Sequence, residues 1–337
     1  MTARDAQIAA FLDGAGWSGA VRDTLAADAS FRRYDRIRQG SRRAVLMDAP
    51  PEHEEIAPFI RLARHLRGLG YSAPEPIEFD LDTGLLLLED LGNDTFTRLL
   101  ADGADEHTLY FLATDLLIDL HRRPREQSLF ASLPPYSDQL MLDEVALMTD
   151  WYMPAVFGGS VDTAERDEYL AAWKSVLPLS RGVPETLVLR DFHVDNLMQI
   201  EGRGGIAACG LLDFQDAVAG PVAYDFVSLV EDARRDVSSA LAEALRERYL
   251  DGVPDMDAAE FDKSCAILGA QRHCKVIGIF TRLCVRDGKP DYLDHIPRVW
   301  RLLTAALTHP ALKDISAWFD NHMPPAKRTV PPCRPAA

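Results

Sequence analysis

The stretch from residue 186 to residue 214 constrains the fold most strongly, because three apolar runs alternate there with polar loops. The runs are 187–189, 197–200 and 206–212. Short apolar runs bounded by Gly-rich turns are typical of buried strands. The pattern therefore predicts strands whose ends bring Asp191, Asn196 and Asp213 close together in space.

These three polar residues offer oxygen donors without cysteine, a donor set that suits a hard cation such as Mg²⁺. An Asp, an Asn five residues later, and an Asp-Phe after a short hairpin form the phosphoryl-transfer arrangement of kinases. We expect Asp191 to receive the proton of an acceptor hydroxyl, and Asn196 and Asp213 to bind Mg²⁺. The alternative is that these residues merely populate turns, but the spacing and the strand context favour the catalytic interpretation.

The composition excludes several classes of protein. The chain has 337 residues, of which 47% are hydrophobic and 26% charged, so it has enough material for two lobes with cores. A net charge of -16 without a long basic run argues against a nucleic-acid partner. No obligate protein partner is evident.

Compartment is predicted from cysteine spacing and from apolar runs. The five cysteines match neither zinc-ligand spacing nor a disulfide framework, which favours a reducing cytoplasm. The N-terminal residues are too acidic for a signal peptide. No apolar stretch approaches the length of a membrane span, so we expect a cytoplasmic protein without membrane contact.

Hydrophobic periodicity predicts a β-rich lobe followed by a mostly helical one. Expected strands are 21–25, 31–37, 44–47, 77–81 and 85–88, with helices 5–14 and 52–67. Beyond residue 92 strands nearly vanish until residue 186. Helices are expected at 105–123, 138–155, 163–177, 223–235, 237–250, 258–285, 291–307 and 311–319. We therefore predict an N-terminal nucleotide-binding lobe (1–91), a C-terminal catalytic and acceptor-binding lobe (92–323) and a mobile Pro-rich tail (324–337).

Five segments carry a resemblance to a known family. They are Asp28-Ala29-Ser30-Phe31-Arg32-Arg33-Tyr34, Leu46-Met47-Asp48-Ala49-Pro50-Pro51, Leu86-Leu87-Leu88-Glu89-Asp90-Leu91-Gly92, Asp191-Phe192-His193-Val194-Asp195-Asn196-Leu197-Met198 and Asp213-Phe214-Gln215-Asp216. With them the chain resembles the aminoglycoside phosphotransferase (APH/choline-kinase-like) family, a branch of the protein-kinase-like fold. Within that family it looks most like the anomeric kinases of N-acetylmuramate and N-acetylglucosamine.

The resemblance implies an α+β fold with two lobes, MgATP as donor and the C1 hydroxyl of an amino sugar as acceptor. The product would be a sugar 1-phosphate used in peptidoglycan recycling. Asp191 matches the catalytic Asp of the family, Asn196 and Asp213 match its metal ligands, and Glu89, Asp90 and Leu91 match the hinge that meets adenine. A kinase for another small hydroxyl compound (aminoglycoside, choline or homoserine) and a nucleotide-binding pseudokinase remain alternatives.

The chain departs from the family pattern at three places. The catalytic loop usually has a His two residues before the Asp, where this chain has Leu189. The third strand usually carries a Lys for the α/β-phosphates, where this chain has Met47. The phosphate loop lacks glycine, which leaves Ser30 as its expected contact. Arg33 or Arg43 is expected to replace the missing Lys.

The acceptor pocket is the part of the site that the sequence specifies least. Candidate residues come from the catalytic loop and from the helical lobe: Arg190, His193, Glu144, Trp151, Tyr152, Arg272, Lys275 and Arg282. A cation among them would suit the lactyl carboxylate of N-acetylmuramate. The competing interpretation of each helical residue is ordinary helix surface or core.

Overall fold

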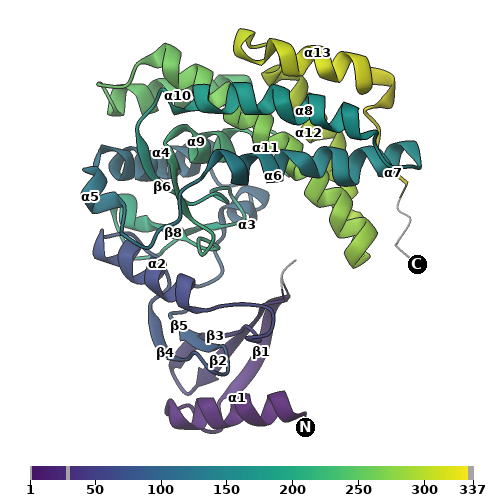
Figure 1. Cartoon of the computed structure of the whole chain (residues 1–337). Coiled ribbons are helices and arrows are strands. Elements are labelled where there is room, and N and C mark those ends of the chain that lie inside the picture. Colours follow the sequence, from purple (N-terminus) through teal and green to yellow (C-terminus); the bar gives the residue numbers. More distant parts are fainter. Residues whose placement is uncertain (1, 28–30, 333–337) are drawn as a thin grey trace. The chain divides into compact units, whose positions relative to one another are not determined.

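The structure is a computed structural model that describes residues 2–27 and 31–332 (Figure 1). It divides into two compact units. Unit 1 comprises Met1–Ala113 and Val194–Asp216, and unit 2 comprises Thr114–His193 and Ala217–Ala337. The lobe boundary expected between residues 91 and 92 stays a prediction.

Unit 1 contains a five-stranded antiparallel sheet in the order β1-β2-β3-β5-β4. Its elements are α1 (Ala3–Gly14), β1 (Val21–Ala27), β2 (Arg33–Gln39), β3 (Arg42–Asp48), α2 (Ala57–Gly68), β4 (Pro76–Asp80), β5 (Leu85–Leu88), α3 (Phe96–Ala101), β7 (Leu197–Gln199), η3 (Gly205–Ala208) and β8 (Cys209–Leu211). The expected hairpin of β4 and β5 is confirmed, and β5 is an internal strand with every side chain buried.

The two faces of this sheet have different partners because side chains alternate along a strand. One face presents Ile37, Leu46 and Leu87, which form a buried cluster with Ile8 and Leu12 of α1. Figure 1 shows α1 beside this sheet. The opposite face presents the alternating positions of the same strands. One face is thereby closed by α1, and the other is left for a pocket.

Helix α2 begins later than its hydrophobic periodicity predicts. The expected start was Glu52, but the helix begins at Ala57, with Pro58 in its first turn. Proline lacks an N–H and has its φ already near the helical value, so it is favoured in a first turn. The apolar pattern continues upstream as far as Ile56, although residues 51–56 form turns and loop.

Unit 2 is mostly helical. Its elements are α5 (Arg125–Ser128), α6 (Asp138–Leu147), η1 (Met148–Tyr152), α7 (Met153–Phe157), α8 (Thr163–Val176), η2 (Leu177–Arg181), β6 (Glu185–Val188), β9 (Val218–Pro221), α9 (Ala223–Val230), α10 (Ser239–Gly252), α11 (Ala258–Asp287), η4 (Pro290–His295), α12 (Ile296–Ala306), η5 (Pro310–Leu312), α13 (Lys313–His322) and η6 (Pro325–Lys327). The division between the units crosses α4 (Glu106–Arg122). Helix α11 packs against α6, η1, α9 and α12, and is buried along most of its length.

The segment from 186 to 214 is only partly as predicted. β7 and β8 form the expected hairpin. The first run, β6, pairs instead with β9, a strand absent from the prediction. β9 reads Val-Ala-Gly-Pro, and its Gly and Pro are unfavourable in strands, so its sequence lacks a strand signature. The expected single helix 138–155 is interrupted by the π-helical turn η1.

Three further features bear on the predictions. Part of the expected mobile tail is held in place, since Arg328 contacts Asp320 and Thr304 while the Thr329 carbonyl accepts a hydrogen bond from Tyr152. Cys284 is disulfide-bonded, whereas Cys209, Cys265 and Cys274 are free. The disulfide of Cys284 departs from the expectation of cysteines without disulfide bonds. Within the described residues, no helix is both long enough and apolar enough to cross a membrane.

Candidate active site

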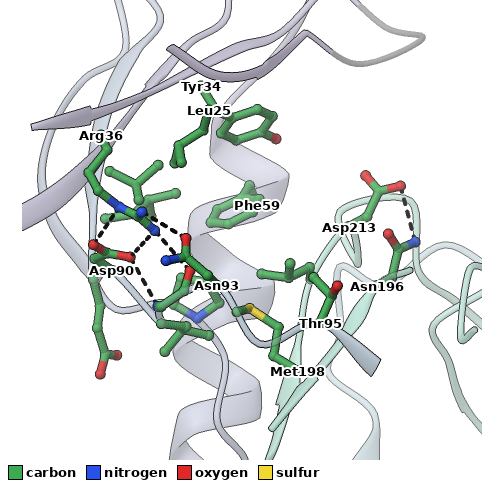
Figure 2. A pocket seen from close by; sticks show the side chains of 17 residues that line it. Leu25, Tyr34, Arg36, Phe59, Asp90, Asn93, Thr95, Asn196, Met198 and Asp213 are labelled. Atoms are coloured by element: carbon green, nitrogen blue, oxygen red, sulfur yellow. Dashed lines mark hydrogen bonds and ion pairs between the residues drawn. The ribbon is translucent and has the colours of Figure 1, made fainter. Parts of the chain in front are cut away.

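A pocket of about 460 Å³ lies in unit 1, on the sheet face opposite α1 (Figure 2). Apolar side chains from three sources surround it: the sheet, α2 and the β7–β8 hairpin. These are Leu25, Val45, Leu88, Phe59, Met198 and Leu212. Polar side chains form two groups on its wall: Arg36, Asp90 and Asn93 lie at one side, and Asn196 and Asp213 lie at the other, with Thr95 nearer the second group (Figure 2). A mostly apolar cavity with a few polar groups suits a flat heterocycle joined to a polar tail.

The segment expected to be a hinge lines this pocket with Glu89, Asp90 and Leu91. The Glu89 side chain is held by Arg67 at 2.8 Å and by Arg203. The Asp90 carboxylate accepts from the Gly92 N–H at 3.0 Å and pairs with Arg36 at 2.8 Å. Since both carboxylates have these partners, the backbone of the segment is the part suited to bind a ligand.

Asn196 and Asp213 come together at the edge of the pocket, as predicted. Nδ2 of Asn196 lies 3.5 Å from Oδ2 of Asp213 (Figure 2). Leu212 donates its N–H to the Asn196 carbonyl at 2.9 Å, which ties the ends of β7 and β8 together. Asp213 has a positive φ of 55°, an uncommon conformation for a residue other than Gly that is found often at functional sites.

The phosphate-contact residues expected from the sequence are not confirmed. Ser30 lies outside the described residues. Of the described residues that line the pocket, none is Arg33 or Arg43. Arg33 lies on the opposite face of β2 from Arg36, which does line the pocket, and the Arg43 side chain is 66% exposed.

In unit 2 the loop after β6 is held by a buried carboxylate. Asp225, in the first turn of α9, accepts hydrogen bonds from the N–H of Leu189 at 2.6 Å and of Arg190 at 2.9 Å. The Arg190 carbonyl accepts from Nη1 of Arg272 at 3.0 Å. Asp225 therefore supports this loop. The loop is held although Leu189 replaces the usual His.

We expect Asp225→Ala to destabilise the protein, because two buried N–H groups would lose their acceptor. The free energy of unfolding should fall by about 2 kcal/mol or more. Burial raises the pKa of Asp225 to about 7. Because the pKa of Asp225 is higher in the folded state than its unfolded value near 4, the wild type gains most stability from this residue at low pH. The difference in the free energy of unfolding between the wild type and Asp225→Ala should therefore shrink as the pH rises from about 4 through 7.

Urea unfolding of both proteins at pH 5 and pH 8 measures this difference. Asp251→Ala removes an exposed carboxylate from α10 and serves as the matched control. Equal stability of Asp225→Ala and the wild type would contradict the assigned support of the loop.

Glu144 is a junction of buried charges rather than a free ligand group. Its carboxylate pairs with Arg190 and with Lys275 at 3.0 Å, and accepts hydrogen bonds from Tyr136 at 2.5 Å and Gln271 at 2.8 Å. Two cations and two hydrogen-bond donors occupy both of its oxygens. Breaking buried ion pairs of this kind by removing one partner is strongly destabilising. Glu144 therefore positions Arg190, the residue before Asp191. Arg190, like Asp213, has a positive φ, of 70°.

Asp191 remains accessible beside these buried cations. Its side chain is 38% exposed, and Nη1 of Arg272 lies 3.8 Å from its Oδ1. Desolvation acts to raise the pKa of Asp191, but Lys275, Arg272, His193 and Arg190 together hold it below its usual range. The carboxylate is thus ionised at neutral pH and able to accept a proton.

The remaining acceptor candidates lie in different surroundings. Burial lowers the pKa of His193, which is thereby kept neutral, near Asp232 and Asp191. Tyr152 is fully buried and accepts from Trp300 at 2.9 Å. Arg282 is ten residues beyond Arg272 on α11, about 15 Å along the helix. Trp151 is half-buried in η1. Their roles in acceptor binding stay predictions.

Sequence reasoning missed residues that lie close to the expected ones. Asp232, 1% exposed, interacts electrostatically with His193 and Arg272. Arg32 pairs with Asp213 at 3.5 Å. Asp232 belongs to a segment expected to be an ordinary helix. Arg32 directly precedes Arg33, one of the two arginines expected to replace the missing Lys. No separate motif distinguished either residue.

Comparison with known proteins agrees with the resemblance predicted from the motifs. The chain is 34% identical to the N-acetylmuramate/N-acetylglucosamine kinase of Caulobacter vibrioides, over 95% of this chain and 97% of that protein. It is 38% identical to the protein of the same name from Pseudomonas aeruginosa, over 86% of this chain and 85% of that protein.

Solved structures show which fold the chain shares with known proteins. The choline kinase LicA from Streptococcus pneumoniae has a TM-score of 0.60 and 11% identity, with 91% of this chain and all of that chain covered. The GDP complex of aminoglycoside 2'-phosphotransferase-IIIa has a TM-score of 0.60 and 15% identity, with 90% and 98% covered. The predicted protein-kinase-like α+β fold is confirmed. Residues 23–261 match the phosphotransferase enzyme family, and the chain therefore belongs to that family.

Proposed function

We propose that this protein is an ATP-dependent kinase that phosphorylates the anomeric C1 hydroxyl of N-acetylmuramate, N-acetylglucosamine or both. The observation that carries the proposal is the identity of 34–38% to four relatives named N-acetylmuramate/N-acetylglucosamine kinase. A sugar 1-phosphate made in this way would serve peptidoglycan recycling.

The pocket of unit 1 supports ATP as the donor. Its apolar walls suit adenine, and its polar side, which includes Asn196 and Asp213, suits the phosphates. A protein of similar fold, APH(2")-IIa, is known in a ternary complex with streptomycin and ATP, which supports a nucleoside triphosphate as the donor here.

Asn196 and Asp213 also fit Mg²⁺. One carboxylate and one amide supply hard oxygen donors, and Mg²⁺ usually takes only one or two carboxylates from the protein together with substrate phosphates and waters. Asn196 directs Nδ2 at Asp213, and the two amide orientations of an Asn are distinguished by its hydrogen bonds. Rotation of this amide would present two oxygens to one cation. When bound, Mg²⁺ neutralises charge on the phosphates.

Asp191 is the proposed catalytic base. The acceptor hydroxyl attacks the γ-phosphorus, its O–H proton passes to Asp191, and the bond from the γ-phosphorus to the β,γ-bridging oxygen breaks to release ADP. Holding the reacting groups in line is the main contribution of such sites. Asp225 and Glu144 serve this purpose by fixing the loop that carries Asp191.

The acceptor side is proposed to include His193, Asp232 and Arg272. Oδ2 of Asp232 and Nδ1 of His193 have no hydrogen-bond partner within the described part of the chain, and both residues are more than nine-tenths buried. Buried polar atoms are normally satisfied. Hydroxyl or amide groups of an amino sugar would satisfy them, and the Arg272 guanidinium would suit a carboxylate.

The pH profile of the reaction should depend on Lys275. Its positive charge is the largest of the interactions that lower the pKa of Asp191. Because the base acts when ionised, activity falls as the pH drops through this pKa. Lys275→Met should therefore move the acid limb of kcat/KM to higher pH.

Lys263→Met removes a lysine of the same helix that pairs with Glu260, so it serves as the matched control. Rates are measured from pH 3 to pH 8 with an ADP-release assay. An acid limb at the same pH in Lys275→Met and the wild type would refute the role of this charge.

A panel of acceptors tests the proposed function. The purified protein with MgATP should release ADP with N-acetylmuramate or N-acetylglucosamine, and phosphorus NMR should show an anomeric phosphate. Turnover only with an aminoglycoside, choline or homoserine would replace the acceptor. Nucleotide binding without turnover on any compound would indicate a pseudokinase.

A further inference from the structure

The chain lacks a cation where related kinases carry the lysine that holds the α/β-phosphates. The corresponding residue, Met47 on β3, is uncharged and 1% exposed. The negative charges of a nucleotide polyphosphate would repel the nearby Asp213 carboxylate. Mg²⁺ offsets part of that repulsion, and in related kinases a protein cation shares the task.

Arg32 is not among the residues that line the pocket in the described structure, but it lies beside Asp213, which is one of them. Its Nη2 is 3.5 Å from Oδ1 of Asp213, and its Nε is 3.9 Å from Oε1 of Glu54. The Arg32 side chain is only 9% exposed, so solvent screens its charge weakly. Both carboxylates attract the guanidinium and hold it at this edge of the pocket.

Other arginines near the pocket are less suited to this role. Arg36 is engaged by Asp90 at 2.8 Å, by Asn93 at 2.7 Å and by the Gly92 carbonyl at 2.9 Å. Arg43 is mostly exposed, and its nearest carboxylate in the described structure is Asp90 at 3.8 Å. Neither of them forms an ion pair with Asp213 in the described structure.

We propose that Arg32 is the phosphate-binding cation of this enzyme and replaces the strand lysine from a different place in the chain. The proposal rests on the proposed ATP-dependent function. Arg32 contacts the phosphates of the bound nucleotide, and Glu54 positions its guanidinium as a helix glutamate positions the lysine in protein kinases. The pairing of a cation with a carboxylate is the same as in protein kinases, although both residues come from other positions in the chain.

The segment before α2 is built to support this pair. The Phe31 ring stacks on His53 with centroids 4.2 Å apart and planes 19° apart. The Glu54 N–H donates to the Pro50 carbonyl at 3.0 Å. The stacking links the chain neighbours of Arg32 and Glu54, and the hydrogen bond fixes the turn that carries Glu54.

Nucleotide binding with and without phosphates tests the proposal. Isothermal titration calorimetry of the wild type, Arg32→Met and Arg32→Lys would use two probes, β,γ-imido-ATP and adenosine. Arg32→Met should weaken β,γ-imido-ATP binding about 10–100-fold, the range for a lost charged hydrogen bond. Adenosine affinity should be unchanged, and Arg32→Lys should recover part of the loss.

The controls separate a phosphate contact from a structural one. Arg38→Met removes an arginine of β2 that is 58% exposed and pairs with Asp23, and it should bind both probes like the wild type. Unchanged β,γ-imido-ATP binding by Arg32→Met would overturn the proposal, as would an equal loss for both probes. A wild-type protein that binds neither probe would overturn the proposed ATP-dependent function itself.

Discussion

Asp191→Asn is expected to lower kcat about 10²–10⁴-fold, the usual contribution of a general base. The amide has nearly the same shape as the carboxylate but cannot take the proton of the acceptor hydroxyl. The loop should stay in place, because Asp225 holds it through the N–H groups of Leu189 and Arg190. Neither of these hydrogen bonds involves the Asp191 carboxylate. The loss should therefore appear in kcat.

The KM for ATP should change little, since the residues that line the described pocket all belong to unit 1 whereas Asp191 belongs to unit 2. Steady-state ADP release with each amino sugar measures both constants. Asp195→Asn makes the same chemical change four residues later, at a carboxylate that accepts from the Thr97 hydroxyl, and it should retain most of the rate. Full activity of Asp191→Asn would eliminate Asp191 as the base.

Asp213→Asn is expected to raise the Mg²⁺ concentration needed for half-maximal rate by about 10–100-fold or more, with a comparable fall in kcat/KM. The substitution removes the negative charge of the proposed cation site while Asn196 and Gln215 keep their places. It also removes one of the two carboxylates that pair with Arg32, while the pair with Glu54 is kept.

Magnesium titrations of the wild type and the variant at saturating ATP measure this effect. Asp216→Asn is the matched control, because Asp216 also accepts from Gln215, at 3.2 Å, but does not line the pocket in the described structure. If Asp213→Asn needed no more Mg²⁺ than the wild type, Asp213 would not be a ligand.

The strand-end residues of the site could be predicted from sequence because their geometry is local. Asn196 and Asp213 flank one hairpin, and the two ends of a hairpin necessarily meet. The proposal of Arg32 in place of Arg33 depends instead on which face each side chain takes where β2 begins, at Arg33. Neighbouring residues of a strand point to opposite faces, so an error of one residue exchanges the inside for the outside.

The buried charges around the loop could not be predicted in the same way. The position of Glu144 within a helix gives no reason for its burial. The reason lies in Arg190, Gln271 and Lys275, which come from a loop and from another helix distant in sequence. A buried carboxylate is favourable only when such partners arrive together, and single-sequence patterns do not contain that information. The late start of α2 and the strand β9 were missed for local reasons, a proline and a weak strand sequence.

The division of unit 1 into two chain segments has a consequence for the order in which the protein forms during synthesis. Its sheet and hinge lie before residue 114, whereas Asn196, Met198 and Asp213 of its pocket wall lie after residue 193. Contacts between segments so far apart in the chain form late, because a long loop must be closed first. A nascent chain therefore completes this pocket only after residues 114–193, the first segment of unit 2, have been synthesised. The proposed donor site is encoded first and completed only after the segment that carries Asp191, the proposed catalytic base.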